Sequence, residues 1–158
     1  MFNALEPRRA CALPSTLGQG RRSFILSIQH TGRGKEFHVP YADDWGLSPD
    51  GSQIAFVDEN EKESQIRLFS LATNEWHDVQ VKGWSGFKSL DWSPTGKTMF
   101  VAGFKSRETS SLLEIDTEGN VRELLEGQIV WAVPSPDGRY LALNERVGTN
   151  NVWLLENF

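Results

Sequence analysis

One short turn sequence occurs three times in this chain of 158 residues. It reads Ser48-Pro49-Asp50-Gly51, recurs 45 residues later as Ser93-Pro94-Thr95-Gly96, and recurs 42 residues after that as Ser135-Pro136-Asp137-Gly138. Proline presets φ at the second turn position, Asp or Thr can bond back to the backbone, and glycine accepts the positive φ that follows. The tetrapeptide is typical of a tight connection between two antiparallel strands, and its spacing indicates an internal repeat.

Short apolar segments flank each turn at matching positions, and most of them alternate with a period of two. Gly, Pro, Asn and Asp separate them, and residues 23–158 contain no convincing helical periodicity. This pattern predicts strands and an all-β fold. The predicted strands are 23–29 and 35–39, then 44–48, 53–58, 65–71 and 75–81, then 88–93, 97–103, 111–116 and 121–125, and finally 129–134, 139–145 and 151–156.

The order of strand, Ser-Pro-Asp-Gly turn, strand, polar loop and strand resembles the TolB-type, WD-repeat-like β-propeller repeat. The resemblance covers about residues 43–158 and, more weakly, 23–42. A repeat of roughly 40–45 residues is the length of one four-stranded blade. The resemblance implies a propeller of antiparallel four-stranded blades. It implies little about activity, because propellers include binding modules, scaffolds and enzymes.

The repeat predicts five segments: a flexible N-terminal segment at 1–22, a partial blade at 23–42, blades at 43–87 and 88–128, and an incomplete blade at 129–158. The apolar run Ala10–Leu13 is too short for the core of a secretory signal. We therefore expect a cytoplasmic protein, or a periplasmic one if a leader has been lost. The N-terminal segment is expected to be disordered or to add one strand.

The thirteen predicted strands are too few for a closed propeller, which has typically 4–8 blades of four strands. An open arc would expose apolar faces and strand edges to water. We therefore expect a homodimer, or another closed oligomer, that completes a six- or seven-bladed ring. Residues Lys35–Val39 of a second copy could supply the outermost strand of the incomplete blade. A fragment of a longer propeller is the alternative.

Composition argues against several other classes. The net charge of −5 and the pI near 5.2 do not fit a nucleic-acid-binding surface. Apolar runs are far shorter than the roughly 20 residues of a membrane-spanning helix. The single Cys11 cannot form an intramolecular disulfide, and the three histidines are isolated in the sequence. We predict no catalytic residue, no metal site and no cofactor.

Five residues are candidate contacts for a partner or for the propeller channel: Asp43, Asp44, Trp84, Phe87 and Asp91. The three acids lie on or near first strands of blades and could face the channel. Alternatively, these acids have a structural role and form hydrogen bonds to the backbone of neighbouring blades. Trp84 and Phe87 could form a contact on the rim or part of a seam between chains.

The tryptophans of the repeat have a structural explanation. Trp45, Trp92 and Trp131 fall on or near the first strand of each blade, and Trp153 falls on a third strand. Aromatic side chains have the area to fill the space between packed sheets. We expect these four to pack between blades.

The sequence therefore predicts a non-catalytic interaction module. We expect it to self-associate and to bind a protein or peptide on a loop face or at the channel mouth. The alternative is a hydrolase or lyase of propeller type that uses acidic residues at the channel mouth.

Overall fold

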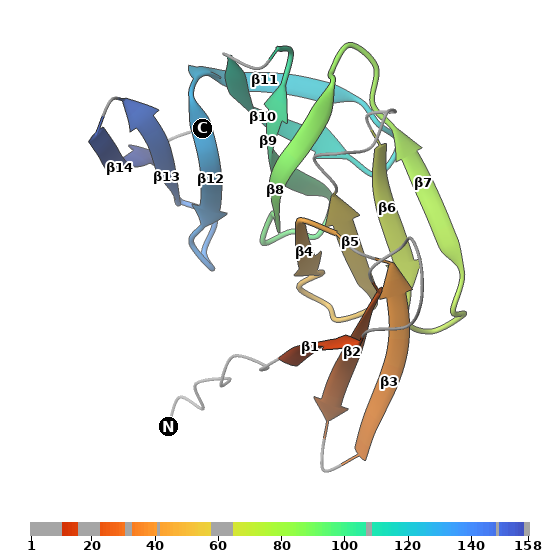
Figure 1. Ribbon diagram of the computed structural model, residues 1–158. Coiled ribbons are helices and arrows are strands. Elements are labelled where there is room, and N and C mark those ends of the chain that lie inside the picture. Colours follow the sequence, from red (N-terminus) through yellow and green to blue (C-terminus); the bar gives the residue numbers. More distant parts are fainter. Residues whose placement is uncertain are drawn as a thin grey trace, which may run out of the picture. The chain divides into compact units, whose positions relative to one another are not determined.

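The computed structural model describes residues 11–15, 23–30, 33–40, 42–57, 65–106, 109–147 and 149–156. Every regular element in these ranges is a β-strand, which confirms the all-β class (Figure 1). The part of the chain so described has no helix with the length and hydropathy needed to cross a membrane. The chain divides into two compact units, Met1–Tyr41 and Ala42–Phe158.

The first unit contains a three-stranded antiparallel sheet of order β1-β2-β3. Its strands are β1 (Cys11–Ser15), β2 (Ser23–His30) and β3 (Arg33–Pro40). Strands β2 and β3 lie where the sequence predicted them. Strand β1 is contributed by the N-terminal segment, whose other residues lie outside the described ranges.

The second unit contains three antiparallel sheets (Figure 1). The first sheet is β4 (Asp44–Leu47), β5 (Gln53–Val57), β6 (Gln65–Ser70) and β7 (Trp76–Gln80). The second is β8 (Gly86–Trp92), β9 (Thr98–Phe104), β10 (Ser110–Asp116) and β11 (Val121–Gly127). The third is β12 (Ile129–Pro134), β13 (Tyr140–Val147) and β14 (Thr149–Glu156). Each sheet follows the chain order, as expected for meandering blades.

The repeated tetrapeptide forms the turn between the first two strands of each sheet in this unit. At the first copy, Gly51 has φ of 71° and its N–H donates to the Ser48 carbonyl at 2.8 Å. The Ser48 hydroxyl donates to Asp50 at 2.6 Å and accepts from the Gln53 N–H at 2.9 Å. Bonds from Ser48 and Ser52 lower the pKa of Asp50 to about 2. The same main-chain bond closes the other two turns.

The first three strands of the second sheet, β8 to β10, are buried on both faces because this sheet lies between the other two. Along β9, Met99 and Val101 pack into a core shared with the first sheet, while Phe100 and Ala102 pack into a core shared with the third. This is the period of two that a strand between two packed layers requires. Strand β8 contacts both β4 and β12, so the first strands of successive sheets are neighbours.

The third sheet is buried on one face only. Ala132, Leu141 and Leu143 pack into the second core. On the opposite face, Trp131 is 49%, Leu154 62% and Val152 77% exposed. The expected packing of Trp92 in the core is confirmed at 4% exposure, whereas Trp131 does not pack between sheets within the described part of this single chain. Trp131 projects from the face on which the described residues place no further sheet.

Candidate functional site

Asp44 connects the first two sheets of the second unit. Its carboxylate accepts one hydrogen bond from the backbone N–H of Leu90 on β8 and another from the N–H of Trp45, both at 2.9 Å. Burial raises the pKa of Asp44, although the two bonds favour the ionised form. Asp44 therefore accepts a hydrogen bond from the backbone of a neighbouring blade. The sequence offered this structural role as the alternative to a contact with the channel.

Asp91 lies on β8 and is partly buried. Burial raises its pKa to about 6, the negative charge of Asp44 adds to the rise, and a bond from the Trp92 N–H opposes it. Asp91 and Asp44 are therefore close enough to interact electrostatically. Their neighbour Asp43 is exposed. Among the described residues, no group of three or more His, Cys, Asp or Glu side chains could hold a metal ion.

The two aromatic candidates lie in different environments. Phe87 is 1% exposed and belongs to the core between the first and second sheets, so the expected rim contact does not fit its burial. Trp84 packs partly buried against the same core, and the Lys105 ammonium lies 4.7 Å from the centroid of its ring. A Cβ at Gly103 would lie 3.0 Å from Trp84, so glycine leaves room for the indole ring.

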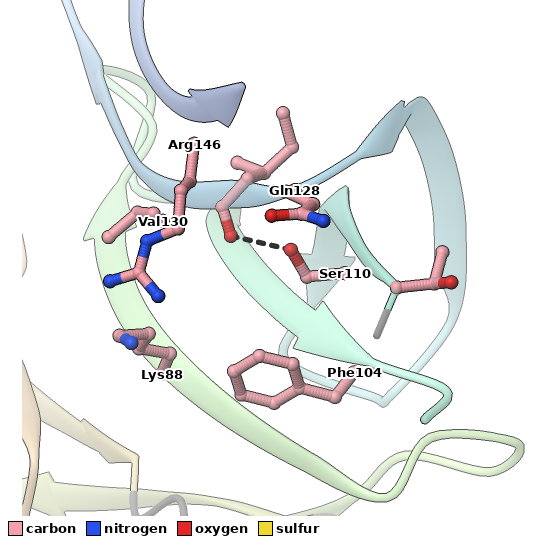
Figure 2. A pocket seen from close by; sticks show the side chains of 8 residues that line it. Lys88, Phe104, Ser110, Gln128, Val130 and Arg146 are labelled. Carbon is pink, nitrogen blue, oxygen red and sulfur yellow. Dashed lines mark hydrogen bonds between the residues drawn. The ribbon is translucent and has the colours of Figure 1, made fainter. Parts of the chain in front are cut away.

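An open pocket of about 570 Å³ lies between the second and third sheets, beside the beginnings of β8 and β12 (Figure 2). The second sheet contributes Lys88, Phe104 and Ser110, while β12 and β13 contribute Val130 and Arg146. In Figure 2 the Arg146 guanidinium extends toward Lys88. The pocket therefore brings two cationic groups together from adjacent sheets.

Two hydrogen bonds hold the wall of this pocket in place. The Ser110 hydroxyl donates to the Ile129 carbonyl at 2.7 Å, which joins β10 to β12 (Figure 2). The Arg146 backbone N–H donates to the Gln128 carbonyl at 2.9 Å, which ties the end of β13 to the residue before β12. The first bond therefore joins the second and third sheets beside the pocket, and the second fixes the backbone at Arg146.

A β-bulge lies at the pocket on each of the two first strands. Pairing between β8 and β9 skips Lys88, and pairing between β12 and β13 skips Val130. The two residues are 42 apart, the same offset that separates the second and third turn sequences. Bulges are frequent beside functional sites, where they redirect a side chain. The repeat thus gives Lys88 and Val130 equivalent positions, both in the pocket wall.

The sequence reasoning missed Lys88 and Arg146. Nothing in their local sequence marks a site, and they lie on different predicted blades. The repeat offset is one signal that could have drawn attention to Lys88, because it aligns Lys88 with Val130 near the start of a first strand.

Together, the meandering antiparallel sheets, their repeated turn and the packing of successive first strands define a β-propeller fold. Solved structures confirm the TolB-like propeller resemblance. TolB from Acinetobacter baumannii matches with a TM-score of 0.66 and 19% identity, over 93% of this chain and 40% of that chain. The β-propeller domain of the Trilobed protease from Pyrococcus furiosus matches with a TM-score of 0.57 and 20% identity, over 94% and 51% of the two chains.

Hydrazine synthase from Kuenenia stuttgartiensis also matches, with a TM-score of 0.61 and 19% identity over 87% of this chain and 48% of that chain. At such identities the likeness shows the fold alone, and this chain spans about half or less of each of these structures. No protein-family model and no curated protein matches the sequence. Because the fold is shared with an enzyme, it does not by itself decide for or against catalysis.

Proposed function

We propose that this chain is a non-catalytic β-propeller interaction module that self-associates to complete its ring and binds a protein or peptide partner. The observation that carries the proposal is the outer face of the third sheet. Trp131, Val152 and Leu154 are exposed there, at 49%, 77% and 62%. Contiguous exposed apolar side chains are typical of interaction surfaces.

The strand register places the exposed apolar residues on one face of the sheet. Asn144 of β13 lies opposite both Trp131 of β12 and Val152 of β14, and Ala142 lies opposite Leu154. Residues directly opposite in antiparallel strands share a face of the sheet. The three exposed apolar side chains therefore project from the same side of the sheet, from β12 and β14, with Asn144 and Ala142 of β13 between them.

The outermost strand of this sheet supports the same proposal. Among the described residues, β14 is the last of three strands in its sheet, whereas the other two sheets of the unit have four strands. An unpaired strand edge is a template for pairing with another chain. Strand β3 is itself an edge strand in the sheet of the first unit, so it is a suitable donor from a second copy.

We favour a second copy of the chain as the occupant because this chain spans only 40% of the TolB structure that it matches. A second copy would supply a comparable set of sheets. Dimers with two-fold symmetry are the commonest closed assemblies. A missing part of the same longer protein is the competing occupant, and the experiment below distinguishes the two.

Light scattering of the purified chain and of two double variants tests the proposal. Val152→Asp with Leu154→Asp places charges on the outer face, while Val121→Asp with Leu125→Asp places them on β11, where each parent side chain is 37% exposed. We expect the parent chain and the β11 variant to be dimers and the outer-face variant to be a folded monomer by circular dichroism. A parent chain that is monomeric at all concentrations would contradict self-association.

The proposal is non-catalytic because Asp44, one of the acidic candidates, is used in the structure of the blades. Both hydrogen bonds to the Asp44 carboxylate come from backbone N–H groups, one of them on the next sheet. Neither Asp44 nor Asp91 lines the pocket between the second and third sheets. The hydrolase or lyase alternative would require a substrate site that includes these acids. The cytoplasmic location stays a prediction from the sequence.

A further inference from the structure

The pocket between the second and third sheets has an excess of positive charge. Lys88 and Arg146 both line it, and within the described ranges neither takes part in a salt bridge. In the same ranges, salt bridges are formed by the cations Arg67, Lys105 and Arg122, each with a carboxylate within 3.3 Å. The charge of this pocket is therefore opposite in sign to the net charge of −5 that the whole chain carries.

The backbone directs the two side chains into this position. Lys88 is the extra residue of a β-bulge in β8, and such a residue departs from the regular alternation of the strand. Arg146 lies one residue before the end of β13, where its N–H is bonded to Gln128. Like charges in one pocket repel each other, and a bound anion would relieve that repulsion.

The other walls suit a ligand that is larger than a simple anion. Phe104 and Val130 present apolar surface beside the two cations, and the pocket volume is about 570 Å³. The Ser110 hydroxyl already donates to the Ile129 carbonyl. A ligand that fits has a carboxylate for the cations and hydrocarbon for the apolar wall.

We propose that this pocket binds a carboxylate side chain of an acidic peptide segment, with Lys88 and Arg146 pairing with its oxygens and Phe104 contacting its aliphatic part. A planar guanidinium can bind a carboxylate through two parallel hydrogen bonds. The inference rests on the proposed function, since it names the chemistry of the partner. Nucleic acid is a poorer fit, because its binding uses rows of cations and this chain is acidic overall.

Fluorescence polarisation with fluorescein-labelled tetraglutamate tests the proposal, and equally labelled tetraglutamine is the neutral probe. The pocket variant combines Lys88→Gln with Arg146→Gln. The matched control combines Lys82→Gln with Arg139→Gln, which removes the same charges from two exposed positions outside the pocket. We expect the parent and control chains to bind tetraglutamate about tenfold or more tightly than the pocket variant does. Tetraglutamine should bind weakly to all three.

Competition separates a peptide from a free anion. We expect unlabelled tetraglutamate to displace the probe at a concentration about tenfold below that of inorganic phosphate, because only the peptide also contacts the apolar wall. Equal displacement by phosphate, equal binding of both probes, or equal loss of binding in the pocket and control variants would overturn the proposal.

Light scattering on the same samples distinguishes the two proposals. A monomer that binds tetraglutamate through the pocket would contradict self-association and support the peptide site. A dimer whose tetraglutamate binding is unaffected by the pocket substitutions would support self-association and overturn the peptide site.

Discussion

The Asp44 carboxylate and the backbone N–H of Leu90, which are 46 residues apart in the sequence, are joined by a hydrogen bond of 2.9 Å. A second bond of 2.9 Å runs from the Trp92 indole N–H to the Gly46 carbonyl. Both bonds connect β8 of the second sheet to β4 of the first. A Cβ at Gly46 would lie 3.2 Å from the Trp92 ring, so the glycine permits this close approach. Polar contacts therefore fix the packing of adjacent blades in addition to the apolar core.

Asp44→Ala should weaken this connection, because it leaves the Leu90 N–H without its acceptor. An unpaired backbone donor in a partly buried place costs about 1–3 kcal/mol. Hydrogen exchange followed by NMR should show faster exchange of the Leu90 amide in this variant. The control is Asp43→Ala, which removes the exposed neighbouring acid and should leave Leu90 protected. Unchanged protection of Leu90 in Asp44→Ala would refute a stabilising role for the bond.

Asp91 should make the folded state less stable as the pH rises, whereas a salt-bridged acid makes it more stable. Burial raises its pKa from 3.8 to about 6, so the folded state binds the proton more tightly than the unfolded state does. The free energy of unfolding should therefore increase as the pH falls through about 6 toward 4. Above pH 6 the ionised carboxylate destabilises the folded state. The raised pKa of Asp44 acts in the same direction.

Urea unfolding of Asp91→Asn tests this expectation. The variant should be more stable than the parent at pH 7.5 by about 1 kcal/mol, a value reduced for solvent screening because Asp91 is only partly buried. The difference should shrink at pH 4.5, where the parent carboxyl is protonated. A difference of the same size at both pH values would show that Asp91 is not the titrating group.

The repeat predicted much of this architecture and little of the candidate site. Every strand from β2 to β14 lies within about two residues of its predicted position, because turn chemistry and alternation are local properties of the sequence. Strand β1 has no such local signal, since Cys11–Ser15 contains a proline and has no counterpart in the repeat.

The pocket required information that no local pattern contains. The bulge at Lys88 depends on its pairing with β9, and the approach of Arg146 depends on how the second and third sheets pack. The exposure of Trp131 likewise depends on whether another sheet covers its face. Phe87 was misjudged because a residue at the start of a first strand can turn either to the rim or into the core.

Two glycines with positive φ should respond differently to alanine. Gly119 has φ of 88°, and a Cβ there would overlap the backbone carbonyl of Gln80. Gly96 has φ of 68°, but its nearest neighbour would be Pro49 at 3.6 Å. Gly96→Ala should cost about 1–2 kcal/mol from the left-handed backbone alone, and Gly119→Ala should cost more because the carbonyl must also move. Thermal unfolding of both variants measures the difference, and equal losses would contradict the clash.

The core between the first and second sheets should be sensitive to the loss of volume. Leu113 is fully buried there, and its replacement by alanine should cost about 2–5 kcal/mol. Leu125 on β11 is 37% exposed, so Leu125→Ala removes the same atoms at a cost of about 1 kcal/mol or less. Chemical denaturation of the two variants compares them directly. Similar losses at both positions would show that this core is less tightly packed than the burial of Leu113 implies.

The molar mass of the purified chain in solution tests the central claim most directly. If a second copy covers the outer face of the third sheet, light scattering should give twice the chain mass of 17.8 kDa, with charges at Val152 and Leu154 returning it to one chain mass. A stable, well-folded parent chain with the mass of one copy at every concentration would contradict the account.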